Sequence, residues 1–167
     1  MQEQRVDKVE ALLADWRRER PDLDVEPMAV VGRILSLGRR LEARANTALK
    51  SLGLHYTDLD VLATLRRGGK PYRLTPTELR ESVLITSGAM TACLDRLESN
   101  GLITRHDNPD DRRSKSAALT SAGTKLIDKA IVIRFEEAAE AMGTMTPRDR
   151  AALAELLKKL GQGLDRQ

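Results

Sequence analysis

Hydrophobic residues recur every three or four positions along most of this 167-residue chain, which is the spacing of amphipathic helices. The first such stretch covers residues 6–16 and ends near Pro21. A longer stretch runs from Pro27 to Leu52 and is followed by Gly53, a residue type that often ends a helix. The pattern therefore predicts two helices before residue 55.

Short capping sequences locate the starts of the later helices. Thr57 opens the sequence Thr-Asp-Leu-Asp, in which the hydroxyl of Thr57 and the carboxylate of Asp60 have the spacing of a capping box. Thr75 is followed by Pro76 and Glu78, the same signal with proline at the first helical position. Further helices are therefore predicted over residues 57–67, 75–83, 86–100 and 121–142, with a last helix from Thr146 onwards.

The periodicity changes after Gly101. Residues 102–106 and 116–119 have the length and composition of short strands, and the charged turn between them predicts a β-hairpin. A helix, a short helix, a turn, a third helix and a hairpin follow one another in the order of a winged helix-turn-helix. The predicted fold class is mainly α, with a small β-hairpin wing and with further helices at both ends.

Composition narrows the classes of protein to consider. Hydrophobic residues make up 41% of the chain but aromatic residues only 2%, so a core must be built from aliphatic side chains and methionine. The net charge of +3 is too small to indicate a nucleic-acid partner by itself. A single cysteine excludes an intrachain disulfide. There is neither a signal-peptide pattern nor an apolar run near the roughly 20 residues that span a bilayer, so we expect a cytoplasmic protein without a membrane partner.

The third helix of the predicted motif, over residues 86–100, has the residue types that a helix entering the major groove of DNA requires. Small and polar side chains at its start can approach base edges, and an arginine at the tip of the wing can enter a narrow minor groove. A charged turn taken alone is as often a solvated surface, so the prediction depends on its position after this helix and strand. The predicted DNA-binding residues are Thr75, Thr86, Ser87, Ala89, Met90, Thr91, Arg112, Arg113 and Lys115.

These motifs resemble those of the MarR family of regulators. The similarity is densest from Leu74-Thr-Pro-Thr-Glu-Leu through the stretch from Leu94 to Arg105, and it continues into the wing. There Asp111-x-Arg113, five residues and then Leu119-Thr120 match the family's wing signature. The resemblance implies a homodimer that binds double-stranded DNA at a near-palindromic operator. It assigns residues 1–55 and 121–167 to a helical dimerisation region and residues 56–120 to a winged helix-turn-helix DNA-binding region, intertwined as one domain.

Within the family the chain is similar to the urate-responsive branch, which has an additional N-terminal helix. The stretches that carry this similarity are DWRRERPDLD, LDVLATLRRGGKPYRLTP and SGAMT. The positions that match the branch's effector residues are Trp16, Asp60, Cys93 and Arg105. Three of them match in kind, but Cys93 stands where the branch has an arginine. The effector is therefore expected to be urate, a related purine, or another small anion or aromatic acid.

Each of these four residues also has a simpler interpretation. Trp16 lies on the apolar face of its helix and could be a core anchor, and Asp60 could only cap a helix. Arg105 could contact a phosphate or a neighbouring acid. Cys93 could be a small buried hydrophobic residue, or a redox switch if a cation or a helix dipole favoured its thiolate.

Four functions from different classes follow from these observations. The first is a repressor released by a small-molecule ligand, and the second is an oxidation-sensing repressor that acts through Cys93. The third is a winged-helix adaptor for protein interactions, which would not need arginines in the wing. The fourth, an enzyme, is excluded because the chain has no phosphate-binding loop, nucleophile elbow or paired catalytic carboxylates. No cofactor is expected, and no metal site either, because His55 and His106 have no third ligand.

Overall fold

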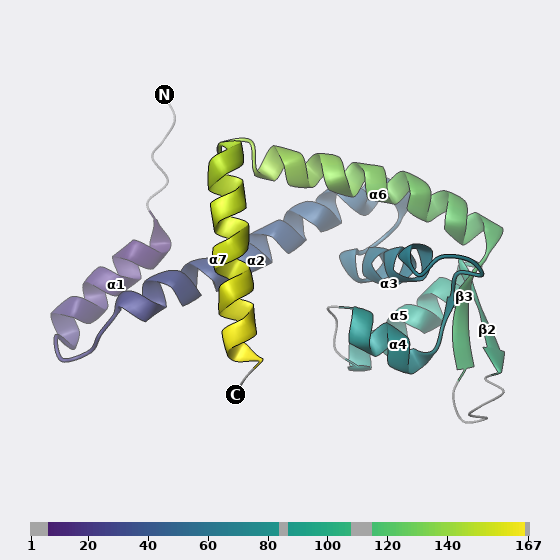
Figure 1. The fold of residues 1–167 in the computed structure, drawn as a ribbon, viewed down its shortest axis with the longest axis horizontal. Coiled ribbons are helices and arrows are strands. Elements are labelled where there is room, and N and C mark those ends of the chain that lie inside the picture. Colours follow the sequence, from purple (N-terminus) through teal and green to yellow (C-terminus); the bar gives the residue numbers. More distant parts are fainter. Residues whose placement is uncertain (1–6, 84–86, 108–114, 166–167) are drawn as a thin grey trace. The chain divides into compact units, whose positions relative to one another are not determined.

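The computed structural model describes residues 7–83, 87–107 and 115–165, which are mostly helical with one small antiparallel sheet (Figure 1). The chain divides into two compact units, Met1–Arg44 and Ala45–Gln167. Among the described residues, no helix combines the length and the apolar character needed to cross a membrane.

The first unit contains α1 (Lys8–Glu19) and most of α2 (Glu26–Leu49). These helices are joined by charge as well as by apolar contact. The guanidinium of Arg33 on α2 donates to the carboxylate of Asp7 at 2.6 Å and to that of Glu10 at 3.2 Å. Leu13 on α1 is 1% exposed and is the buried residue of that helix.

The second unit has the helix order and the sheet of a winged helix-turn-helix, which confirms the predicted fold class. The three strands form an antiparallel sheet in the order β1-β3-β2. Of these, β1 was not predicted, because two residues are too few to produce a periodic pattern. The elements are η1 (Lys50–Leu52), α3 (Tyr56–Arg67), β1 (Arg73–Leu74), α4 (Pro76–Ser82), α5 (Ser87–Ser99), β2 (Ile103–Asp107), β3 (Lys115–Leu119), α6 (Ser121–Ala141) and α7 (Pro147–Leu164).

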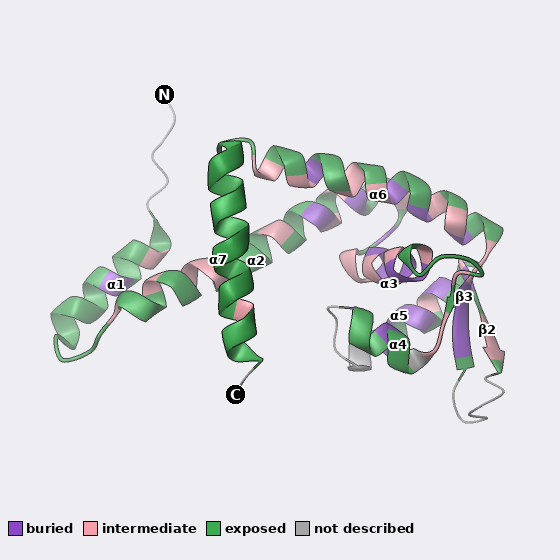
Figure 2. Cartoon of the chain, viewed as in Figure 1, coloured by how far each residue is buried: buried purple, intermediate pink, exposed green. Residues whose placement is uncertain are grey.

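The core of the second unit lies between α3, α5, α6 and the sheet (Figure 2). Its buried members are aliphatic side chains with one methionine and one cysteine, in agreement with the low aromatic content. Leu62 and Leu65 on α3, Leu79 on α4, Leu97 on α5 and Ile127 on α6 are each at most 1% exposed. Because one face of α5 is packed in this way, its opposite face is left for other contacts.

Two of the predicted capping boxes are present, and the third is placed differently. Thr75 caps α4 with Glu78, and Thr146 caps α7 with Asp149. The prediction of a box between Thr57 and Asp60 is wrong, because α3 begins at Tyr56. A long-range contact explains the shift, since the backbone N–H of Tyr56 donates to the side-chain oxygen of Asn46 at 2.8 Å.

The start of α6 is held against the end of α5 and the start of β2 by a tight junction. The Thr120 hydroxyl caps α6 by accepting from the N–H of Gly123 at 2.9 Å, and it donates to the carbonyl of Gly101 at 2.8 Å. A methyl group at residue 123 would lie 2.0 Å from the carbonyl oxygen of Leu102. The close approach of backbone to backbone therefore requires glycine at this position.

We expect Gly123→Ala to destabilise the protein by about 1–3 kcal/mol, because the added methyl group must push α6 away from β2. Chemical denaturation followed by circular dichroism measures this change. Gly38→Ala is the control, since a methyl group at that exposed position in α2 would meet nothing within 4 Å. The control should raise stability by about 0.5–1 kcal/mol through helix propensity. Equal stability of Gly123→Ala and wild type would contradict the tight junction.

Candidate nucleic-acid interface and effector site

The two faces of α5 have different surroundings. Met90, Cys93, Leu94 and Leu97 are buried. Thr91, Asp95 and Glu98 are exposed and, being four and three residues apart, share the opposite face. Thr91, one of the predicted DNA contacts, is therefore exposed on this face. The prediction for Met90 needs correction, because its side chain is 4% exposed and packs in the core, where it cannot reach a base edge.

The other predicted DNA contacts are distributed over α4 and the wing. Thr75 is half-buried, and its hydroxyl is engaged in the capping box of α4, donating to the Glu78 carboxylate at 2.8 Å. Lys115 is exposed at the start of β3 and lies 3.8 Å from the Asp107 carboxylate across the hairpin. Thr86, Arg112 and Arg113 lie outside the described residues, as do the side chains of Ser87 and Ala89.

An ion pair connects the wing to α5. Arg105 on β2 donates to the carboxylate of Asp95, and its Nε lies 3.3 Å from the carboxylate of Glu98. The Arg105 side chain is 24% exposed, while those of its two partners are 60% and 44% exposed. Arg105 thus offsets one of the two negative charges on the exposed face of α5, which reduces the repulsion that these acids would exert on a DNA phosphate.

A second polar cluster connects α5 to α3 around a buried carboxylate, while the side chain of Arg96 in this cluster is 38% exposed. The Asp58 side chain is 2% exposed, and its Oδ1 accepts from Arg96 Nε at 3.0 Å and from the Cys93 thiol at 3.3 Å. Its other oxygen accepts from the backbone N–H of His55 at 2.9 Å, where it caps α3. Asp58 is therefore an acid of α3 that contacts residues of α5.

The predicted effector residues are distributed over both units, and within the second unit Cys93 and Arg105 have different surroundings. Trp16 is 49% exposed and lies in the first unit, so it is no core anchor there. Asp60 is half-buried on α3. Cys93 contacts Asp58 in the interior, whereas Arg105 pairs with acids on the exposed face of α5. Arg96 and Asp58 were missed by the sequence interpretation, although Arg96 follows Cys93 by three residues and so shares its side of the helix.

The Cys93 thiol has the surroundings of a structural cysteine. Burial, followed by the hydrogen bond to the Asp58 carboxylate, raises the pKa of Cys93 from 9.0 to about 12. The thiol is therefore protonated at neutral pH. A reactive cysteine requires thiolate character and access to solvent, and Cys93 has neither.

Comparisons with known proteins agree with this geometry. A family model described as the MarR family matches residues 52–114. The HTH-type transcriptional regulator PecS of Dickeya dadantii is 32% identical over 157 residues, which are 94% of this chain and 95% of PecS. The chain belongs to the MarR family. Its relatives of this family are transcription regulators and not enzymes.

Solved structures of this family include complexes with DNA. The regulator Sco3205 of Streptomyces coelicolor, in complex with DNA, is 26% identical with a TM-score of 0.75, over 85% of this chain and 93% of Sco3205. A mutant of MarR from E. coli, complexed with operator DNA, is 27% identical with a TM-score of 0.71, over 81% of this chain and 96% of that one. This MarR-family chain is accordingly a DNA-binding transcriptional regulator.

The pKa of Cys93 predicts how stability depends on alkaline pH. The unfolded chain loses the thiol proton near pH 9.0, whereas the folded chain keeps it to about pH 12. The protonated thiol therefore adds to the free energy of unfolding in full below pH 9.0, and this contribution is lost as the pH rises toward 12. Cys93→Ser keeps a donor to Asp58 but does not titrate. Urea denaturation of both proteins from pH 8 to 11 should show a steeper fall for wild type, and parallel curves would contradict the raised pKa.

Proposed function

We propose that this protein is a sequence-specific regulator that binds a near-palindromic operator as a homodimer and is released by a small anionic or aromatic effector. The observation that supports it best is the position of α5. One face of this helix is buried in the core, and the other carries the exposed Thr91 and pairs with the basic Arg105 of β2. This is the arrangement that major-groove and minor-groove contacts require together.

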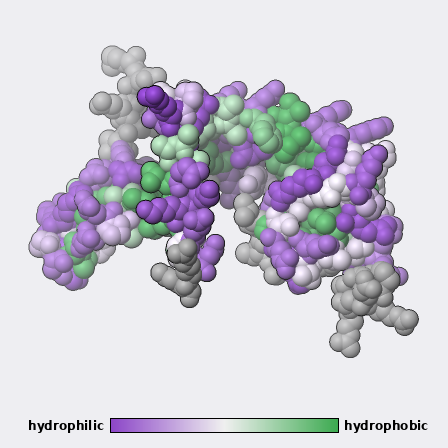
Figure 3. Space-filling view, in the orientation of Figure 1, coloured by the Kyte–Doolittle hydropathy of each residue, from purple (hydrophilic) through white to green (hydrophobic). Residues whose placement is uncertain are grey.

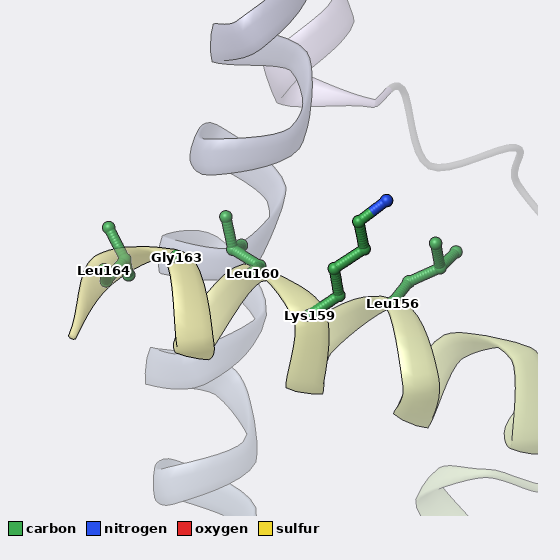
Figure 4. Close-up of a pocket in the computed structure, with 5 residues that line it drawn as sticks. All are labelled: Leu156, Lys159, Leu160, Gly163 and Leu164. Atoms are coloured by element: carbon green, nitrogen blue, oxygen red, sulfur yellow. The ribbon is translucent and has the colours of Figure 1, made fainter. Parts of the chain in front are cut away.

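The apolar surface of the terminal helices supports the homodimer. No residue of α7 is buried, and Leu156 and Leu164 are each 65% exposed. Leu156, Lys159, Leu160, Gly163 and Leu164 line a hollow formed by α7 alone (Figure 4). Phe135 on α6 is 72% exposed, and apolar patches appear between charged side chains at the surface (Figure 3). Helices of this kind bury their apolar faces against another copy of the chain, and a two-fold dimer matches a palindromic operator.

Trp16 and Arg105 are the residues that we assign to the effector. Trp16 exposes half of a large aromatic ring that can stack on a planar ligand. Arg105 is held by partly solvated carboxylates, with which a ligand anion can compete. Asp60 on α3 is the third residue that we assign to the effector site. Cys93 is neutral and therefore supplies no positive charge to an anionic ligand. An effector of this kind acts by binding the DNA-free arrangement of the dimer more tightly than the DNA-bound one.

Oxidation sensing through Cys93 is the weaker candidate, because the thiol is buried and protonated. A regulator of that kind predicts release from DNA by peroxide, and that release would disappear in Cys93→Ala. The protein-interaction adaptor has no observation in its favour over DNA binding.

We expect Arg113→Ala to weaken operator binding by about 1–3 kcal/mol, because a wing arginine that enters the minor groove loses its contact. Fluorescence anisotropy measures this with a duplex carrying the promoter region beside the protein's own gene, against a non-specific competitor. Arg148→Ala on the exposed start of α7 removes the same charge elsewhere and should leave affinity unchanged. If wild type prefers neither that duplex nor any duplex selected from a random pool, the proposal of sequence-specific DNA binding is wrong. The remaining hypothesis is then the adaptor for protein interactions.

Urate is the first effector to test. Added to the wild-type operator complex it should lower the affinity, and Trp16→Ala should remove this response while keeping DNA binding. Leu12→Ala, which truncates another half-exposed apolar side chain of α1, is the control and should keep the response. An operator complex that is indifferent to urate would exclude the purine, and a panel of aromatic carboxylates would follow.

A further inference from the structure

One carboxylate fixes the start of α3 and the middle of α5 at the same time. Both oxygens of Asp58 are engaged, one by the His55 N–H at the start of α3 and the other by Arg96 and Cys93 of α5. With its side chain 2% exposed, Asp58 has little access to water to replace any of these donors. Loss of Arg96 therefore leaves a buried carboxylate without its cation, which makes the arrangement strongly preferred.

The remaining contacts of α5 with the core are apolar and do not have this directionality. Met90, Leu94 and Leu97 fill space, and such contacts tolerate small rotations of a helix about its axis. An arginine donating two N–H groups to one carboxylate accepts a much narrower range of orientations. The rotation of α5 decides which side chains of its first half face outward, Thr91 among them.

We propose that Arg96 is a positioning residue that sets the rotation of α5 through Asp58 and thereby decides how well the helix reads its operator. This inference rests on the proposed DNA-binding function. Arg96 itself is turned toward α3, and its guanidinium also lies 3.5 Å from the hydroxyl of Thr57. It acts without contacting DNA. Cys93 supports it with a neutral donor to the same oxygen, one turn earlier on the helix.

This role differs from a phosphate contact in a way that can be measured. A phosphate contact strengthens binding to all duplexes alike and contributes about one to the salt slope of the binding constant. A residue that only aligns α5 changes binding to the operator and leaves non-specific binding and the salt slope as they are. Misalignment equivalent to one lost base contact lowers specific affinity by about tenfold.

The test compares Arg96→Gln, Arg96→Lys and Asp58→Asn with wild type, at a temperature where circular dichroism shows every variant folded. Arg66→Gln is the matched control, because it removes an arginine that pairs at 2.8 Å with Asp128 and joins α3 to α6 instead. Operator and non-specific duplexes are titrated by fluorescence anisotropy over a series of salt concentrations. Amide hydrogen exchange of residues 90–99 is measured on the same proteins without DNA.

We expect Arg96→Gln to lower operator affinity by about tenfold, with unchanged non-specific affinity and salt slope, and Arg96→Lys to recover part of the loss. Asp58→Asn combined with Arg96→Gln should cost less than the sum of the two single changes, because both break the contact between Asp58 and Arg96. Exchange in α5 should rise in Arg96→Gln and remain unchanged in Arg66→Gln.

Two results would overturn the proposal. Equal losses on operator and non-specific duplexes with a smaller salt slope would make Arg96 a phosphate contact. The second result is that Arg96→Gln shows the same hydrogen exchange in α5 and the same operator affinity as Arg66→Gln. The ion pair between Arg96 and Asp58 would then have no positioning role. If wild type binds no duplex specifically, the DNA-binding function fails, while the exchange of α5 still decides whether Arg96 holds this helix.

Discussion

A buried carboxylate must have its oxygens engaged by hydrogen-bond donors, and the placement of α5 depends on how Asp58 meets this requirement. Its donors come from the start of α3 and from two residues of α5, so the two helices are held together by one charged group. Packing of the aliphatic core stabilises the contact between these helices, and the hydrogen bonds of Asp58 fix their relative orientation. A recognition helix needs both, because base contacts depend on displacements smaller than a side chain.

Local patterns predicted most elements of the fold, but not β1 or the start of α3. Thr75 and Thr146 began helices as their capping sequences indicate, and the change of period after Gly101 located the hairpin. The start of α3 was misplaced because it depends on Asn46, ten residues earlier, whose side chain accepts the N–H of Tyr56. The box that forms instead joins His55 to Asp58, a spacing of three residues that the sequence also contains but that lacks the usual serine, threonine or asparagine at its start.

The candidate site was predictable in its residue types but not in its pairings. Small residues on α5 and arginines after β2 follow from what DNA contacts require, whereas the burial of Met90 follows only from the packing of α5. The pairing of Arg105 with Asp95 and Glu98 joins β2 to the exposed face of α5, and no spacing in the sequence indicates it. Cross-element ion pairs of this kind depend on strand register and helix rotation, which short-range spacing does not determine.

The two ion pairs that hold α5 differ in how readily a ligand can open them. Arg96 pairs with a carboxylate that is 2% exposed, and separating them leaves a charge in the interior. Arg105 pairs with side chains that are 60% and 44% exposed, and these acids can be hydrated when the arginine turns to a new partner. An anionic effector therefore competes at lower cost for Arg105 than for Arg96. In the proposed release mechanism Cys93 is neutral, so the cation for an anionic effector comes from the wing, and release from DNA begins with the contact between Arg105 and the acids of α5.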